Sequence, residues 1–448
     1  MKSIKIISLF VNVLFLVMEL QAQRPASNNT LTLSSAIDLA MKNNQQIQIQ
    51  DALVGISERQ VFKANAGLLP TVNALGGVNY ANNYTEVDIR TFQENNPLIE
   101  VNDWGVASTT LNLGVQADYA LYDGRRGKQR LQLFENQAIM ARQQSDVLKN
   151  NTTDAVIQLF FEIQKIQNQE TLLEENISIS EERVQKMKDR LAFGKVNQLA
   201  VLRAQTDLNQ DINTLDNIRL VKTNLIQDLN FLLGKNPNEF YRVDIDLEER
   251  ATVEEATLQN DIANLNPEVQ LSQKGIALAM QQLELAKADQ MPVVGAFANF
   301  GLFWQKNDLQ QLARLQNIGF TVGISARYNL FDGGIIKNQI QTKQLQVEVE
   351  KMRNEQLVSQ LHSRAVKEKS NIELLQVQIA REQQNLETFE ENFNRTQERF
   401  YVGKATALDL RAAQLAQLNA KITIDDLKIK KMQAMYVLEK YRGRLLQD

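Results

Sequence analysis

An internal duplication constrains the fold of this chain more than any other feature of its sequence. Two motifs occur twice, each copy opening or ending a long helical pattern: LYDG at 121–124 and LFDGG at 330–334, FGK at 193–195 and VGK at 402–404. The two copies lie about 209 positions apart, and a second register of about 222 positions relates Asn44 to Asn266 and Pro70 to Pro292. Strands that feed very long helices, present twice, predict a repeat architecture.

Two segments without glycine or proline predict the long helices. Lys128 to Phe193 and Ile335 to Val402 each hold about 66 residues, which would span about 100 Å as one helix. This length indicates a coiled coil or a barrel-type helical assembly. Apolar residues recur in steps of three and four, the spacing that drives left-handed supercoiling. Each helix is expected to turn back after its glycine, into Leu199–Leu233 or Leu408–Leu446.

Four segments alternate between apolar and polar residues, at about 71–84, 109–121, 293–304 and 318–330. Such alternation is required of a transmembrane barrel strand, and a half-buried strand of a soluble sheet shows it equally. Four strands cannot close a membrane barrel, which needs about eight. Either the sheet is soluble, or several chains share one barrel, and three chains would supply about twelve strands.

Bulk composition narrows the class of protein. The formal net charge of −4 argues against a nucleic-acid binder, which would need a basic face. Residues 1–22 read as a signal peptide, with a membrane-anchoring helix as the alternative. The absence of cysteine excludes disulfides and thiolate metal sites. No later segment approaches about 18 consecutive apolar residues, so no spanning helix is expected beyond that point.

Residues typical of catalysis or metal binding are scarce. His362 is the only histidine and lies within a helical segment, where a surface position is the simplest interpretation. The sequence contains no phosphate-binding loop of the G-x-x-x-x-G-K-[ST] type. We therefore expect no enzyme activity and no bound cofactor or metal.

The order and spacing of these features resemble the TolC-type outer-membrane efflux proteins. The resemblance rests on the signal peptide, the duplicated unit, the LYDG and LFDGG motifs, and the tip sequences FGKVNQLAVLRAQ and VGKATALDLRAAQ. It extends over essentially the whole mature chain. It implies a homotrimer in the outer membrane, with a twelve-stranded β-barrel continued by a periplasmic α-helical barrel. It also implies a periplasmic adaptor protein and an inner-membrane pump as partners, and outer-membrane lipid around the barrel.

The expected fold class is mainly α with a membrane β part. The expected domain organisation has four parts: a signal peptide at 1–22, a first repeat at 23–233, an equatorial connector at 234–260 and a second repeat at 261–448. Each repeat contains a helix, two strands and a helical hairpin, with the tips at Gly194 and Gly403. The first helix, over residues 33–69, is expected to end before Pro70 because proline disfavours helix at the preceding residue.

The resemblance places Asp409 at the closed periplasmic aperture, together with Phe400 and Lys404. In a trimer, three copies of Asp409 would surround one axis. Such a ring favours cations, and repulsion among its members raises some of the carboxyl pKa values. An ordinary aspartate on a helix surface is the alternative.

Two positions depart from the family pattern at this gate. The family often has a second acidic residue where this chain has Ala412, and another in the first repeat where it has Ala200. A simpler gate is therefore expected, without a full set of closing salt bridges. Arg411 and Lys404 are the candidate ion-pair partners of Asp409.

The resemblance assigns adaptor docking to the helix tips, at Gly194, Leu199, Gly403 and Leu408. A notch lined by glycine lets a partner backbone approach closely, although a plain turn glycine is compatible with the same sequence. Aromatic residues near the strand ends would form girdles at the two membrane interfaces: Tyr80, Tyr84, Trp104, Trp304 and Tyr328. Packing within loops or the sheet is the alternative for these residues.

Together these expectations predict a passive outer-membrane exit duct of a tripartite efflux pump or type I secretion system, gated at the periplasmic helix tips. The rival hypothesis is a non-transporting periplasmic coiled-coil scaffold with a small soluble sheet. The strands discriminate between the two, because a scaffold does not need lipid-facing residues such as Phe320, Ile324 and Tyr328.

Overall fold

The structure is a computed structural model that describes residues 30–90, 98–245, 255–308 and 313–445. The predicted signal peptide at 1–22 lies outside these residues, as does part of the predicted connector at 234–260. The chain divides into two compact units. The first unit comprises residues 1–50, 145–269 and 357–448, and the second comprises residues 51–144 and 270–356.

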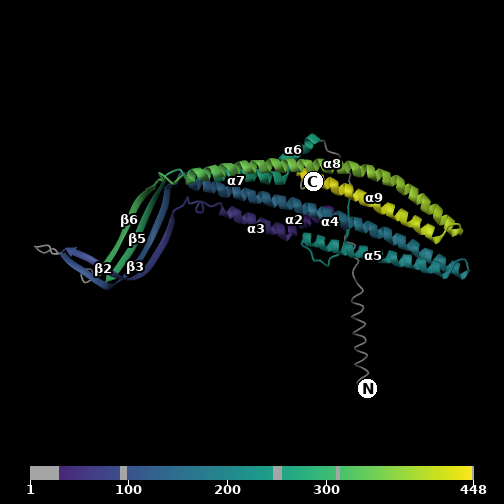
Figure 1. Cartoon of the computed structure of the whole chain (residues 1–448), viewed down its shortest axis with the longest axis horizontal. Coiled ribbons are helices and arrows are strands. Elements are labelled where there is room, and N and C mark those ends of the chain that lie inside the picture. The colour runs from purple at the N-terminus through teal and green to yellow at the C-terminus, as the bar shows by residue number, and fades with distance from the viewer. Residues whose placement is uncertain (1–29, 91–97, 246–254, 309–312, 446–448) are drawn as a thin grey trace, which may run out of the picture. The chain divides into compact units, whose positions relative to one another are not determined.

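Two pairs of helices of matching length confirm the predicted duplication (Figure 1). The long helices α4 (Arg126–Ala192) and α8 (Ile335–Tyr401) have 67 residues each. The return helices α5 (Gln198–Leu233) and α9 (Ala407–Arg442) have 36 each. Within the described residues, none of the helices is long and apolar enough to cross a membrane.

An aspartate begins each long helix and explains the LYDG and LFDGG motifs. The carboxylate of Asp123 accepts a hydrogen bond from the Gly127 amide at 2.5 Å. That of Asp332 accepts from the Gly334 and Ile336 amides, both at 2.8 Å. The first amides of a helix have no partner within the helix, so a carboxylate at this position stabilises its start.

The shorter helices differ from the prediction. A single helix was expected over 33–69, but α2 (Leu33–Asn43) and α3 (Gln45–Gln60) are separate and the helix ends before Val61. Asn44 interrupts it with extended backbone, and its side-chain oxygen accepts from the amides of Gln46 (2.9 Å) and Ile47 (3.2 Å). A side chain that bonds its own following backbone in this way starts a new helix.

The same joint recurs in the second repeat. Here α6 (Glu255–Leu265) and α7 (Pro267–Ala288) meet at Asn266, whose oxygen accepts from the amides of Glu268 (2.9 Å) and Val269 (3.2 Å). Both asparagines also donate to a carbonyl at the end of a return helix. Asn44 donates to Leu232 and Asn266 to Tyr441, each at 2.9 Å. These contacts explain why asparagine occupies the equivalent positions 44 and 266 in the two repeats.

A glycine ends each return helix against these joints. Gly234 and Gly443 lie in the left-handed region, with φ of 63° and 76°. A Cβ on Gly234 would lie 2.6 Å from the Asn43 carbonyl oxygen, and one on Gly443 would lie 2.4 Å from that of Leu265. Helix α9 therefore ends at Arg442, four residues before the predicted Leu446.

A four-stranded antiparallel sheet lies in the second unit, in the order β2-β3-β5-β6 (Figure 1). Its strands are β2 (Thr71–Arg90), β3 (Leu98–Tyr122), β5 (Val293–Asn307) and β6 (Arg314–Arg327). Strands β2 and β3 extend well past the predicted limits because their ends pair with each other as a ribbon. Strand β6 begins and ends earlier than the predicted 318–330. The β3–β5 pairing joins the two repeats.

A second, smaller sheet was not predicted. Strand β1 (Thr30–Thr32) pairs in parallel with β4 (Arg242–Asp244) in the first unit. The side-chain amide of Gln167 holds this pair to α4, since it donates to the Val243 carbonyl and accepts from the Val243 amide, both at 3.0 Å.

Helix α4 buries two apolar stripes in the first unit. Val156 and Phe160 belong to one cluster, which includes residues of α2, α5 and both short strands. Ile157 and Phe161 belong to another, which includes residues of α6, α8 and α9. All four are fully buried. Helix α4 therefore has packed neighbours on two sides.

We predict that Gly234→Ala destabilises the protein more than Gly194→Ala does. Both glycines have left-handed φ, which costs an alanine about 1–2 kcal/mol, but open space surrounds Gly194 whereas a Cβ at Gly234 meets the Asn43 carbonyl. Thermal unfolding followed by circular dichroism measures both. Equal losses of melting temperature would show that the backbone conformation alone, and not the close approach, requires glycine.

Candidate functional site

The helix tips are the first candidate site, and they expose large apolar side chains. At the first tip the backbone turns at Gly194 (φ 68°), and at the second it turns at Gly403 (φ 79°). The following lysine amides donate back into the helices, Lys195 to Arg190 at 2.8 Å and Lys404 to Arg399 at 2.7 Å. This is the pattern of a glycine helix cap.

Four apolar residues flank these two glycines. Their side chains are 51% to 79% exposed: Phe193, Leu199, Val402 and Leu408. Sequence reasoning selected Leu199 and Leu408 but missed Phe193 and Val402, which stand directly before the glycines. Exposed apolar residues gathered at the end of a structural element are typical of a contact surface for another protein.

Asp409 forms the capping box that begins α9. Its carboxylate accepts from the Thr406 hydroxyl at 2.7 Å and the Thr406 amide at 2.9 Å, while its own amide donates to that hydroxyl at 3.1 Å. These hydrogen bonds lower the pKa of Asp409, first the one from the hydroxyl and then the one from the amide. In the first repeat Asn197 caps the helix through the Ala200 amide instead.

Phe400 does not occupy the exposed position that an aperture residue requires. Its side chain is 1% exposed and packs in a cluster with residues of α4, α5 and α9. The Arg190 guanidinium lies 4.3 Å from its ring centroid and donates a hydrogen bond to its carbonyl. Phe400 therefore holds the hairpins together. Lys404, by contrast, is exposed at the tip.

A buried polar network joins the two hairpins below the tips, and sequence reasoning missed it. Arg411 of α9 makes two hydrogen bonds to Asp211 of α5, at 2.6 and 2.8 Å. Ser180 of α4 donates to the same carboxylate at 2.7 Å. Arg411 was one of two candidate partners of Asp409, but its guanidinium is engaged by Asp211 instead. The Asp211 side chain is 7% exposed.

The network continues through Gln414 of α9. Its amide donates to the Asn176 side chain at 2.8 Å and to Ser180 at 3.1 Å, and its oxygen accepts from Arg183 at 2.9 Å. Arg183 also lies 3.3 Å from the Asp207 carboxylate. Burial, and then the charge of Arg411, lowers the pKa of Arg183. The formal charges of the two arginines and the two aspartates in this network sum to zero.

A further contact joins α4 to α8. The Tyr401 hydroxyl donates to the Glu182 carboxylate at 2.8 Å, and the Lys186 ammonium lies 5.5 Å from the Tyr401 ring centroid. Burial, followed by the Glu182 hydrogen bond, raises the pKa of Tyr401. Both hairpins of one chain are thus tied together near their tips.

The second candidate site is the four-stranded sheet, whose two faces differ in chemistry. Opposite residues in the register share a face, and successive residues alternate between faces. One face is apolar across all four strands, for example in the row of Ala74, Val115, Phe300 and Phe320. Phe320, Val322 and Ile324 are 68% to 77% exposed on it. The predicted alternation is confirmed.

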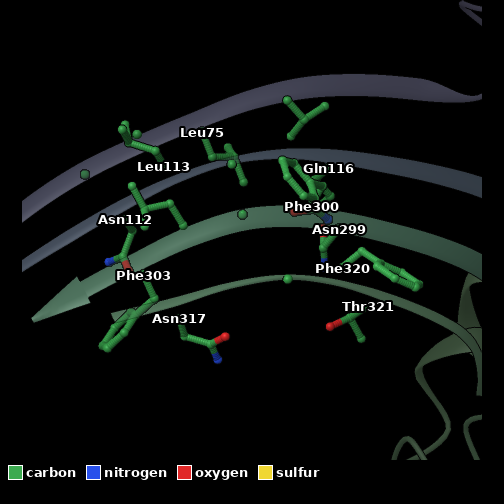
Figure 2. Close-up of a pocket in the computed structure, with 17 residues that line it drawn as sticks. Leu75, Asn112, Leu113, Gln116, Asn299, Phe300, Phe303, Asn317, Phe320 and Thr321 are labelled. Carbon is green, nitrogen blue, oxygen red and sulfur yellow. The ribbon is translucent and has the colours of Figure 1, made fainter. Parts of the chain in front are cut away.

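The other face is polar and rich in glycine (Figure 2). A row of Gly114, Gly301 and Gly319 crosses three strands on this face. Amide side chains flank this row: Asn112, Gln116, Asn299 and Asn317. Phe303 lies beside Asn112 and Asn317, at one end of the pocket in Figure 2. Because glycine has no side chain, a pocket is left here, and none of the residues that line it is charged.

The five predicted girdle aromatics lie in different settings. Tyr80 and Trp304 stand at neighbouring levels of the apolar face. The rings of Tyr84 and Trp104 contact each other, with centroids 4.7 Å apart. Trp104 remains 81% exposed, and Tyr328 follows the end of β6 and is 58% exposed.

We predict that Asp211→Asn destabilises the protein strongly, whereas Asp216→Asn has a small effect. Removing one partner of a buried ion pair costs about 3–5 kcal/mol, because it leaves Arg411 charged and buried. Asp216 is exposed on α5, so its loss should cost about 1 kcal/mol or less. Denaturant unfolding of the two variants provides the test. Similar losses would mean that the network contributes no more than surface charges do.

A sequence profile described as outer membrane efflux protein matches residues 36–235 and 258–444. No match was found among curated protein sequences.

The fold is similar to solved outer-membrane proteins. VceC of Vibrio cholerae is 17% identical with a TM-score of 0.71, over 92% of this chain and 96% of that one. The CmeC channel of Campylobacter jejuni is 14% identical with a TM-score of 0.73, over 92% and 86%. The open state of the MtrE channel of Neisseria gonorrhoeae is 14% identical with a TM-score of 0.64, over 92% and 88%.

Proposed function

Because this chain belongs to the outer membrane efflux protein family, we propose that it is the passive exit duct of a tripartite efflux pump or type I secretion system. The observation that carries the proposal is the two-faced sheet with two free edges. Its strands present an apolar face and a polar face, and neither β2 nor β6 has a partner on its outer edge among the described residues.

An assembly of three chains would satisfy the free edges. An exposed strand edge is a template for pairing with another chain, and an unpaired edge cannot persist in lipid. If β6 of one copy pairs with β2 of the next, three copies give twelve strands in a closed ring. The apolar face would then contact lipid, and the amides and glycines would line an aqueous interior.

The apolar face is tall enough for this role. It extends from the level of Ala296 to that of Trp304 on β5, which is about 27 Å along a strand at roughly 3.4 Å per residue. With the usual tilt of about 40°, this corresponds to roughly 20 Å along the membrane normal, close to the apolar band of known barrels. A periplasmic scaffold has no use for such a face, so the rival hypothesis leaves it unexplained.

The tips are the proposed gate. In a trimer, Asp409 of three copies would surround the axis near the end of the duct, and the capping box would hold each carboxylate in place. The exposed residues Phe193, Leu199, Val402 and Leu408 form a surface that suits a periplasmic adaptor. The buried network of Asp211 and Arg411 links the two hairpins of one chain, so we expect them to move together. The energy for transport would come from a partner pump.

Electrical recording in planar bilayers, combined with the mass of the purified protein in detergent, tests the proposal. We expect a species of three chains that gives discrete, cation-sensitive conductance steps. A monomeric protein that never inserts would contradict the duct and favour the scaffold.

We predict that Asp409→Asn weakens the block of this conductance by divalent cations. Three carboxylates at one aperture attract cations, and the lowered pKa of Asp409 in the single chain keeps it charged at neutral pH. Asp216→Asn serves as the matched control, because Asp216 is equally exposed on α5 but distant in sequence from the tip. If both variants are blocked as strongly as the natural protein, Asp409 does not line the aperture.

A further inference from the structure

A row of four hydrogen-bond donors crosses the apolar face of the sheet at one end. Tyr80, Thr109, Lys306 and Arg314 lie directly opposite one another in successive strands β2, β3, β5 and β6. Because opposite residues share a face, all four side chains lie on the face that carries Phe320. Two hydroxyls, an ammonium and a guanidinium thus stand side by side, and we call these four residues the donor row.

The two cations of the donor row form an unfavourable pair on their own. Lys306 and Arg314 are direct cross-strand partners, and like charges in this relation destabilise a sheet. Both are exposed. Arg314 donates to the Gln316 side chain at 2.8 Å, which positions its guanidinium along β6. An anion between the two cations would turn their repulsion into two charge-assisted hydrogen bonds.

The donor row lies at the boundary of the apolar face. The next level toward the helices contains Val78, Leu111, Trp304 and Gln316, and apolar levels follow it. Beyond the row, Asp308 directly follows the end of β5, and its amide donates to the Ala107 carbonyl at 3.0 Å. Here a level with an amphipathic tryptophan is followed by a level with two cations, at the end of a face proposed to contact lipid. This arrangement suits the binding of a lipid headgroup.

We propose that the donor row binds the phosphate group of an anionic lipid of the outer membrane, with the acyl chains of that lipid on the apolar levels below. The proposal rests on the duct function, since it needs the apolar face to contact lipid. It favours a lipid over free phosphate because the row is continuous with that face. A lipid gains apolar burial and phosphate contacts together, whereas inorganic phosphate gains only the latter.

The test is a binding measurement on the full chain purified in a mild neutral detergent. Diphosphoryl lipid A is the probe, phosphatidylcholine is the lipid control, and native mass spectrometry counts the lipids bound at each concentration. The variant Lys306→Gln/Arg314→Gln removes both charges and keeps hydrogen-bonding side chains. We expect its affinity for lipid A to fall about 25-fold, from roughly a fivefold loss per cation.

Arg327→Gln is the matched control, because it removes one charge from β6 on the polar face at the other end of the strand. Its lipid A affinity should equal that of the natural protein. Equal affinity in the double variant and the natural protein would overturn the proposal. If millimolar inorganic phosphate competes for the site as strongly as lipid A does, the site takes free phosphate. That result would overturn the lipid assignment.

Bilayer conductance of the same preparations separates this proposal from the duct function. The double variant should keep the natural conductance, since the donor row lies on the outer face. A natural protein that fails to conduct contradicts the duct alone, because lipid binding is read independently in detergent. If the protein conducts but binds lipid A no more tightly than phosphatidylcholine, the result contradicts the donor-row proposal alone.

Discussion

The structure depends on the burial of the apolar faces of its long helices. A single helix gains little stability from its own hydrogen bonds and relies on the packing of its apolar face. Helix α4 satisfies this requirement on two sides at once, because Phe160 and Phe161 are adjacent in sequence but enter different clusters. A helix with neighbours on two sides is suited to a curved wall of helices, whereas an isolated two-stranded coil needs only one seam.

Each of the two repeats contributes helices to this wall. Positions that are equivalent in the two repeats show which contacts the fold requires. The joints at Asn44 and Asn266 and the stops at Gly234 and Gly443 recur with the same hydrogen bonds and the same close approach. The tips, in contrast, have diverged. Thr406 and Asp409 form a charged capping box where the first repeat has Asn197 and an alanine. The two hairpins share their packing and differ in the charge at their ends, where the proposed gate lies.

The buried network and the two-faced sheet place polar groups in opposite ways. Near the tips, Asp211 and Arg411 are removed from water and satisfied by each other, which ties two hairpins together. In the sheet, the amides around the glycine row remain open to solvent on one face while the other face is apolar. A duct through a membrane requires both features, since its wall must be rigid and its sheet must separate lipid from water.

Local pattern determined much of this protein. The lengths of α4 and α8, the alternation in the sheet and the tip glycines follow from residues close together in the chain, whose spacing alone sets helix or strand. Tertiary structure decided the rest. The parallel pair of β1 and β4, the burial of Phe400 and the partnership of Arg411 with Asp211 join residues about 200 positions apart. A buried aspartate on a long polar helix has the same sequence pattern as a solvated one, and only the helix packed against it distinguishes them.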